Sequence, residues 1–214
     1  MGHILGVLSG GIQQTLQITI SAFLLGAVLG LPLAMMRRSG LWALQLPAVA
    51  VVEILRAVPP IVWLFIVYYA IGSGSIKLST YQAATVGLGL MASAHLSEIY
   101  RAGLNSVPTG QWEAVRALGL PKVPSYARVI LPQAFIVVIP PMATFAIGLL
   151  KDSATASVIG ATDIAFRAVQ QTQQDLNGLG NFAVAGLLYI LLSIPVAAVS
   201  RGVDKALSRK LALI

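Results

Sequence analysis

The chain has 214 residues, of which 57% are hydrophobic and 10% are charged, and its formal net charge is +7. Soluble domains carry about 25% charged residues, so this composition excludes an ordinary soluble fold and indicates a protein that crosses the membrane several times. The absence of cysteine excludes disulfides and thiolate metal sites. The excess of Lys and Arg is more typical of residues that set membrane topology than of a nucleic-acid interface.

Five apolar segments predict five transmembrane helices in a single all-α domain that comprises residues 1–214. The expected spans are residues 12–36, 57–71, 78–100, 130–150 and 176–200. Each is close to the length of about 20 residues that a helix needs to cross a bilayer. No Lys or Arg precedes Arg37, so a cleavable signal peptide is not expected and the first segment is retained as a span.

Two features near these segments leave structural alternatives open. Gly26 and Gly30 are four residues apart in the first span, which is typical of close helix contact, although glycines are also common in membrane helices without that role. Segment 41–56 is intermediate in polarity. Glu53 and Arg56 lie three residues apart in it, and this spacing on one helical face predicts an ion pair.

The distribution of basic residues predicts the orientation. With five spans and the N-terminus outside, the C-terminus is cytoplasmic, and eleven of the fourteen Lys and Arg residues lie inside. The three outside are Lys77, Lys151 and Arg167. The polar stretch 100–135 is therefore expected on the cytoplasmic side.

Stretch 100–135 is the longest polar interruption of the chain and contains two helical signals. Residues 112–118 read as a short helix, with Gly119 suited to the left-handed position after it and Pro121 just beyond. Pro124 fits the first turn of a second helix over residues 125–131, before Pro132 begins the next apolar segment.

Residues 110–135, GQWEAVRALGLPKVPSYARVILPQAF, resemble the EAA loop of ABC importer permeases. The matching positions are Glu113-Ala114-Val115, Gly119 and Ile130-Leu131-Pro132, with Val115 in place of the second alanine of the pattern. SEIYRAGLNSVPTGQ over residues 97–111 and LLKDSATASVIG over residues 149–160 are similar to the branch that carries polar amino acids. The resemblance covers nearly the whole chain.

The resemblance implies that the loop, about residues 101–132, forms coupling helices seated in a groove of a separate cytoplasmic ATPase dimer. The residues implied in this contact are Glu113, Ala114, Arg116, Ala117, Gly119 and Leu120. A basic amphipathic loop on the membrane surface is the alternative. Because the chain has no Gly-Lys dipeptide, it has no phosphate-binding loop, and ATP and Mg²⁺ are expected only on the partner ATPase.

Two clusters of polar residues are candidates for a substrate path. They are His95 with Glu98, and Lys151 with Asp152 and Ser153. Ionisable groups inside a membrane are functional candidates, yet either cluster could equally be a structural contact. No arrangement of residues suggests catalysis or a metal site.

The resemblance thus implies a permease subunit of an ATP-driven importer for polar amino acids, working by alternating access in the bacterial inner membrane. It is expected to be a transport subunit and not an enzyme. The resemblance implies a second permease subunit, identical or homologous, and an extracytoplasmic binding protein that meets the outer loops 72–78 and 151–175. A secondary transporter or channel that uses no ATP, and a membrane scaffold that transports nothing, are the alternatives.

Overall fold

The computed structural model describes residues 2–72 and 77–211, and this part of the chain contains helices and turns but no strand. Residues 73–76 of the expected outer loop 72–78 lie outside the described residues. The helices in chain order are α1 (Gly2–Ser9), α2 (Ile12–Arg37), α3 (Trp42–Ala57), α4 (Pro60–Phe65) with a π-helical continuation (Ile66–Ile71), α5 (Thr80–Asn105), α6 (Thr109–Ala117), α7 (Lys122–Pro124) with a π-helical continuation (Ser125–Ile130), α8 (Leu131–Asp152) with a 3₁₀ continuation (Ser153–Ile159), α9 (Ile164–Asp175) and α10 (Gly178–Leu211).

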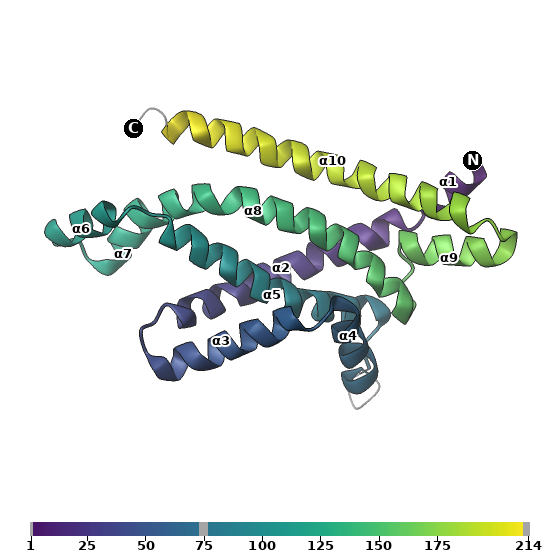
Figure 1. Cartoon of the computed structure of the whole chain (residues 1–214), viewed down its shortest axis with the longest axis horizontal. Helices are drawn as coiled ribbons and strands as arrows, with labels where there is room; N and C mark the ends of the chain where they lie inside the picture. Colours follow the sequence, from purple (N-terminus) through teal and green to yellow (C-terminus); the bar gives the residue numbers. More distant parts are fainter. Residues whose placement is uncertain (1, 73–76, 212–214) are drawn as a thin grey trace.

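The molecule is elongated, and its long helices run between two ends (Figure 1). One end carries α6 and α7 together with the turn between α2 and α3, and the last turns of α10 lie toward it. The opposite end carries α1, α9 and the start of α10. These are called the α6 end and the α9 end below.

Within the described residues, three helical stretches are long and apolar enough to cross a membrane: Gly2–Arg37, Lys122–Ile159 and Gly178–Val203. The bent pair of α3 and α4 passes the same test only when taken together. α5 has 26 residues, which correspond to about 39 Å of helix and exceed the bilayer core. The expected five spans are obtained only by adding both the bent pair and α5.

The expected second span, residues 57–71, is not one helix in the structure. α3 ends at Ala57, and α4 begins at Pro60 at an angle of 103° to it. A residue before proline is driven out of the helical region, and Val58 is accordingly extended with φ −88° and ψ 130°. The break therefore falls inside the predicted span, and the segment 41–56 supplies the longer helix of the pair.

The helix expected over residues 125–131 is present, but it is not separate from the next one. Helical structure is continuous from Lys122 to Ile159, through Pro132, Pro140 and Pro141. A proline removes one backbone hydrogen bond from a helix, but a membrane helix tolerates this because local adjustments and neighbouring groups compensate. Here the chain turns as a π-helix over Ser125–Ile130 just before Pro132.

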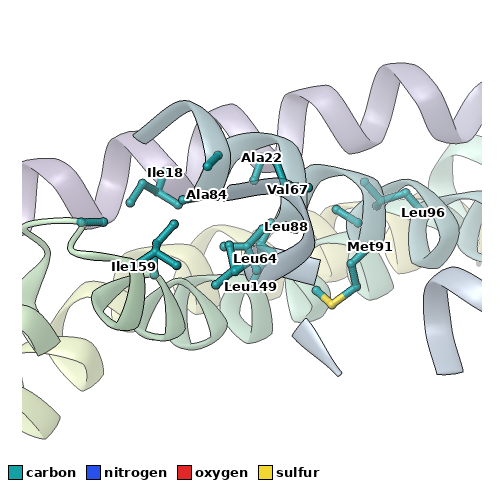
Figure 2. Packing of buried hydrophobic residues seen from close by; sticks show 14 residues of the cluster. Ile18, Ala22, Leu64, Val67, Ala84, Leu88, Met91, Leu96, Leu149 and Ile159 are labelled. Atoms are coloured by element: carbon teal, nitrogen blue, oxygen red, sulfur yellow. The ribbon is translucent and has the colours of Figure 1, made fainter. Parts of the chain in front are cut away.

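The core forms where α2 packs along α5, with α4 and α8 against the pair. Ile18, Ala22, Leu88 and Leu149 point into this layer and are fully buried (Figure 2). Burial by protein explains why α5 is less apolar than the other long helices: alanine, glycine and serine fill most of its inward positions.

Glycines set the distance between α2 and α5. A Cβ atom on Gly26 would lie 2.5 Å from the Cβ of Ala92, and one on Gly30 would lie 2.8 Å from the carbonyl oxygen of Ser93. Such distances are too short for any side chain, so the backbones meet here directly. The close-contact interpretation of Gly26 and Gly30 is confirmed.

Polar groups fasten the start of α2 to the segment before α9. The buried Thr15 hydroxyl accepts a hydrogen bond from the Ile164 N–H at 3.2 Å. Asp163 caps α9 by accepting from the Phe166 N–H at 2.8 Å, and it also accepts from the Tyr189 hydroxyl of α10 at 3.2 Å. Three separate elements are therefore joined at the α9 end.

Candidate coupling corner and charged cluster

A sharp corner joins α6 to α7 at the α6 end. Gly119 adopts the left-handed conformation with φ +60°, as its place after the helix predicts. The Gly119 N–H donates to the carbonyl of Arg116 at 3.0 Å, and the Leu120 N–H donates to that of Val115 at 3.1 Å. These bonds pair backbone groups that the end of α6 would otherwise leave free.

The corner projects apolar side chains into its surroundings. Leu118 is 73% exposed and Val123 is 77% exposed, while Val115 beneath them is buried. The six residues that the sequence assigned to coupling lie on the exposed surface of α6 and the corner: Glu113, Ala114, Arg116, Ala117, Gly119 and Leu120. Leu118 and Val123 were not among the candidates, although their apolar character beside Gly119 was visible in the sequence.

The corner is held against the long helices by aromatic contacts. The ring of Trp112 on α6 meets the ring of Tyr126 edge-on, with centroids 5.5 Å apart. The guanidinium of Arg38, just past α2, lies 6.0 Å from the Trp112 ring centroid, and Arg38 also donates to Asn105. A displacement of α6 would therefore also displace the end of α2 and the helical segment that leads into α8.

A cluster of three arginines surrounds Glu98 on α5. Arg37 from α2 forms an ion pair with its carboxylate, and the Arg101 guanidinium donates to it at 2.7 Å. Arg56 from α3 lies 3.7 Å from the same carboxylate and 3.9 Å from that of Glu53. The expected partners Glu53 and Arg56 are thus within ion-pair distance of each other, and Arg56 in addition reaches another helix.

This cluster borders an open cavity of about 430 Å³. The lining residues are Arg56, Glu98, Ile99, Arg101, Ala102 and Pro141. His95 lies one turn away on α5, where its ring stacks on Phe145 at a centroid distance of 5.2 Å. The three arginines carry one more positive charge than Glu98 and Glu53 together neutralise, so the cavity is suited to an anionic group.

Comparison with known proteins identifies the family. The family described as "Binding-protein-dependent transport system inner membrane component" matches residues 22–211. The chain belongs to this family.

Individual relatives agree with this assignment. The chain is 34% identical to the L-cystine transport system permease protein TcyB of Bacillus subtilis (strain 168), over 96% of this chain and 88% of that protein. It is 31% identical to the probable glutamine ABC transporter permease protein GlnM of the same organism, over 93% and 92%. A crystal structure of an amino acid ABC transporter with histidines shares 27% identity and a TM-score of 0.87, covering 94% of both chains.

Membership of this family establishes the general role of the protein. It is a transport subunit and not an enzyme, and it works with a separate ATPase subunit and a substrate-binding protein. The expected all-α membrane fold is confirmed. Neither the relatives nor the similar structure supports a transporter that runs without ATP.

The structure does not bring the two predicted substrate clusters together. Lys151 and Asp152 end α8 at the α9 end, and the buried Ser153 hydroxyl donates to the Leu150 carbonyl at 2.7 Å. Pro141, which lines the cavity beside Glu98, precedes Lys151 by ten residues, or about 15 Å of helix. The two sets are therefore separate places in this permease.

The sequence did not single out Arg37 as a partner of Glu98. Arg37 lies 61 positions before Glu98, and Arg56 lies 42 positions before it. Only the packing of α2 and α3 on α5 brings these guanidinium groups together, so local spacing carried no signal for them. Arg101 differs from them, since it follows Glu98 by three residues on one helix face, a spacing that favours an ion pair.

Proposed function

We propose that this permease is the membrane-spanning subunit of an ATP-driven importer of amino acids in the bacterial inner membrane. The α6 end, with Arg37, Arg38, Arg116 and Lys122, faces the cytoplasm, in keeping with the preference of basic residues for that side. The α9 end faces outward. ATP and Mg²⁺ bind the partner ATPase and not this chain.

The excess positive charge around Glu98 is the observation that supports amino acids as the substrates. Every α-amino acid has a carboxylate, and guanidinium groups bind carboxylates through paired, charge-assisted hydrogen bonds. Arg56 and Arg101 are about two-fifths exposed and border the cavity, whereas Arg37 is largely buried. In this proposal Arg56 and Arg101 hold the substrate carboxylate, and the ion pair with Arg37 holds the Glu98 carboxylate in place.

The remaining polar candidates have secondary roles in the proposal. Glu98 and His95 lie on the same side of α5 and offer groups to the substrate ammonium or side chain. Lys151, Asp152 and Ser153 lie farther toward the outside, where they fit an entrance better than the central site. The names of the relatives include cystine and glutamine, both of which carry the zwitterion that this arrangement requires.

A second permease subunit, identical or homologous, is part of the proposal. The cavity beside Glu98 is open on the surface of the single chain. Open polar surface at membrane depth needs cover, because lipid offers no hydrogen bonds to charged groups. Two subunits that face each other across this cavity would enclose a path for the substrate.

The coupling corner supplies the mechanical input. The exposed residues Glu113, Ala114, Arg116, Ala117, Gly119 and Leu120 contact the ATPase in this proposal, joined by Leu118 and Val123. Closure of two ATPase subunits around ATP would shift both corners. The Trp112 contacts would pass this shift to α2 and α8, so that the cavity opens alternately to each side.

Replacing Arg101 by glutamine tests the substrate site. We expect Arg101→Gln to lower kcat/KM for amino-acid uptake at least about tenfold, which corresponds to about 1.4 kcal/mol of lost interaction. Arg201→Gln, at an exposed position of α10, is the matched control and should transport normally. Radiolabelled uptake into proteoliposomes that contain the complete transporter measures both. Equal uptake by the two variants would refute the assignment of this cavity.

A further inference from the structure

The turn between α9 and α10 lies at the far end of the molecule from α6 (Figure 1). It presents two leucines, Leu176 and Leu179, which are 89% and 88% exposed. These are the highest exposed fractions of any large apolar side chain within residues 2–72 and 77–203, for which side-chain exposure is described. The two side chains thus form a small apolar tip, called here the leucine tip.

Folding does not explain the leucine at position 176. Leu176 has φ +55° and is the one non-glycine residue with positive φ in the described ranges. The left-handed region disfavours residues with a Cβ atom, and glycine or asparagine would fit it better. Because the side chain is exposed, burial gives no compensating stabilisation. A leucine in this conformation points to a use outside the subunit.

Hydrogen bonds fix the turn beneath the leucines. Asp175 accepts from the Asn177 N–H at 2.9 Å, from the Asn181 side-chain amide at 2.9 Å and from that of Gln171 at 3.1 Å. Asn177 in turn accepts from the Gly180 N–H at 3.2 Å, and a Cβ on Gly180 would lie 2.6 Å from the Asn177 amide nitrogen. The tip is therefore pre-shaped, which lowers the entropy lost on binding.

The residues around the tip favour a protein partner over lipid. Exposed neutral amides flank it, namely those of Gln173, Gln174 and Asn177. Segment 168–182 has no Lys, Arg, Trp or Tyr, the residues that anchor proteins at membrane surfaces, and its one charge is the carboxylate of Asp175. A pair of apolar side chains within a ring of neutral hydrogen-bonding groups matches the centre and rim of a protein interface.

We propose that the leucine tip is a docking contact for the extracytoplasmic substrate-binding protein. This inference rests on the proposed function, which places the α9 end outside the membrane. The two leucines would enter an apolar depression on the binding protein, while the amides of Gln173, Gln174 and Asn177 bond to its rim.

Asparagine at the tip separates docking from a structural role. Asparagine suits the left-handed conformation, so Leu176→Asn should leave the thermal stability of the permease unchanged or raise it. If Leu176 has only a structural role, Leu176→Asn should leave transport unchanged or increase it, as it does the thermal stability. If it serves docking, the same variant should weaken binding. Gln174→Asn, an exposed amide replaced by another two positions away, is the matched control.

The probe is the substrate-loaded binding protein that stimulates ATP hydrolysis by the wild-type complex in nanodiscs. We expect Leu176→Asn and Leu179→Asn each to raise the half-maximal concentration of that protein at least about fivefold, and the double variant more, with basal hydrolysis unchanged. Gln174→Asn should match the wild type. Half-maximal concentrations within a factor of two of the wild type for all variants would overturn the docking contact.

Two further outcomes are distinguishable. A wild-type complex that no binding protein stimulates would contradict the proposed function itself. Normal stimulation of the variants, combined with lower melting temperatures of the tip variants than of the wild type in nanodiscs of phosphatidylcholine and phosphatidylglycerol but not in detergent, would assign the leucines to the membrane and refute the docking contact.

Discussion

Gly119 is the residue whose conformation shapes the coupling corner. A Cβ at this position meets no atom within 4 Å, so only the backbone angle φ +60° opposes a substitution. We expect Gly119→Val to cost about 1 to 2 kcal/mol locally and to distort the corner, whereas Gly119→Asn should be tolerated. Gly119→Val should retain ATP hydrolysis in the complex but lose uptake, measured as substrate imported per ATP hydrolysed.

Comparing Gly119→Val with Gly119→Asn separates the effect of backbone conformation from the effect of side-chain size. Both enlarge the side chain at the same exposed position, and only valine disfavours the left-handed region strongly. Normal coupling in Gly119→Val would show that the bend of the corner is unimportant for energy transfer.

Asp163 is expected to make the stability of the permease depend on pH. It is fully buried, and burial raises its pKa to about 6 although the Phe166 N–H and the Tyr189 hydroxyl lower it in part. A carboxyl with a raised folded-state pKa stabilises the fold most when protonated. This contribution, about 2 to 3 kcal/mol, is fully present below about pH 4 and is lost as the pH rises through about 6.

Replacing Asp163 by asparagine should remove this dependence. Asparagine can still accept from the Phe166 N–H, but it carries no charge at any pH. Thermal unfolding in nanodiscs between pH 4.5 and 8 should show a falling melting temperature for the wild type and a flatter profile for Asp163→Asn. The variant should exceed the wild type above pH 7, and parallel profiles would contradict the proposed origin of the effect.

At the scale of elements, the contact of α2 with α5 predicts a sharp difference between glycines. Gly26→Ala would put its Cβ 2.5 Å from that of Ala92, and the two helices would have to separate. We expect a loss of about 1 to 3 kcal/mol and a clearly lower melting temperature. Gly186→Ala on α10 is the control, since a Cβ there meets nothing within 4 Å. Equal melting temperatures for the two variants would contradict the observed packing.

The sequence predicted the helices that end at clear signals and missed those shaped by tertiary contacts. Arg37 and Arg38 correctly marked the end of the first span, and Gly119 marked the end of α6. The Pro59-Pro60 pair was expected near the start of the second span, and the structure interrupts the helix there, between Ala57 and Pro60. Pro132, in contrast, was taken as a boundary although the helix continues through it.

The candidate functional residues also differ in how far the sequence could predict them. The residues that the sequence proposes for coupling are adjacent along the chain, and the structure exposes them on one corner together with Leu118 and Val123. The charged cluster could not be predicted in full, since Arg37 and Arg56 reach Glu98 from two other helices. Close spacing along one helix can be read from sequence, but contacts between helices depend on how they pack.

Across the molecule, the proposed function gives the two ends of the permease different tasks. The α6 end offers an exposed apolar corner of neighbouring residues, and the α9 end offers the leucine tip. The charged cavity beside Glu98 lies between them. In the proposed mechanism, the outer end receives the loaded binding protein, the cavity holds the amino acid, and the inner end receives motion from the ATPase.

In the proposed mechanism, the α6–α7 corner couples ATP hydrolysis by a partner to transport through this subunit. The most direct test of this coupling is uptake of a radiolabelled amino acid by proteoliposomes that contain the complete complex, the complex without ATPase, or the complex with Val123→Asp at the corner. We predict ATP-dependent uptake in the first and none in the second, with Val123→Asp losing both bound ATPase and uptake. Uptake that persists without the ATPase, or a Val123→Asp complex that retains ATPase and full uptake, would contradict the proposed coupling.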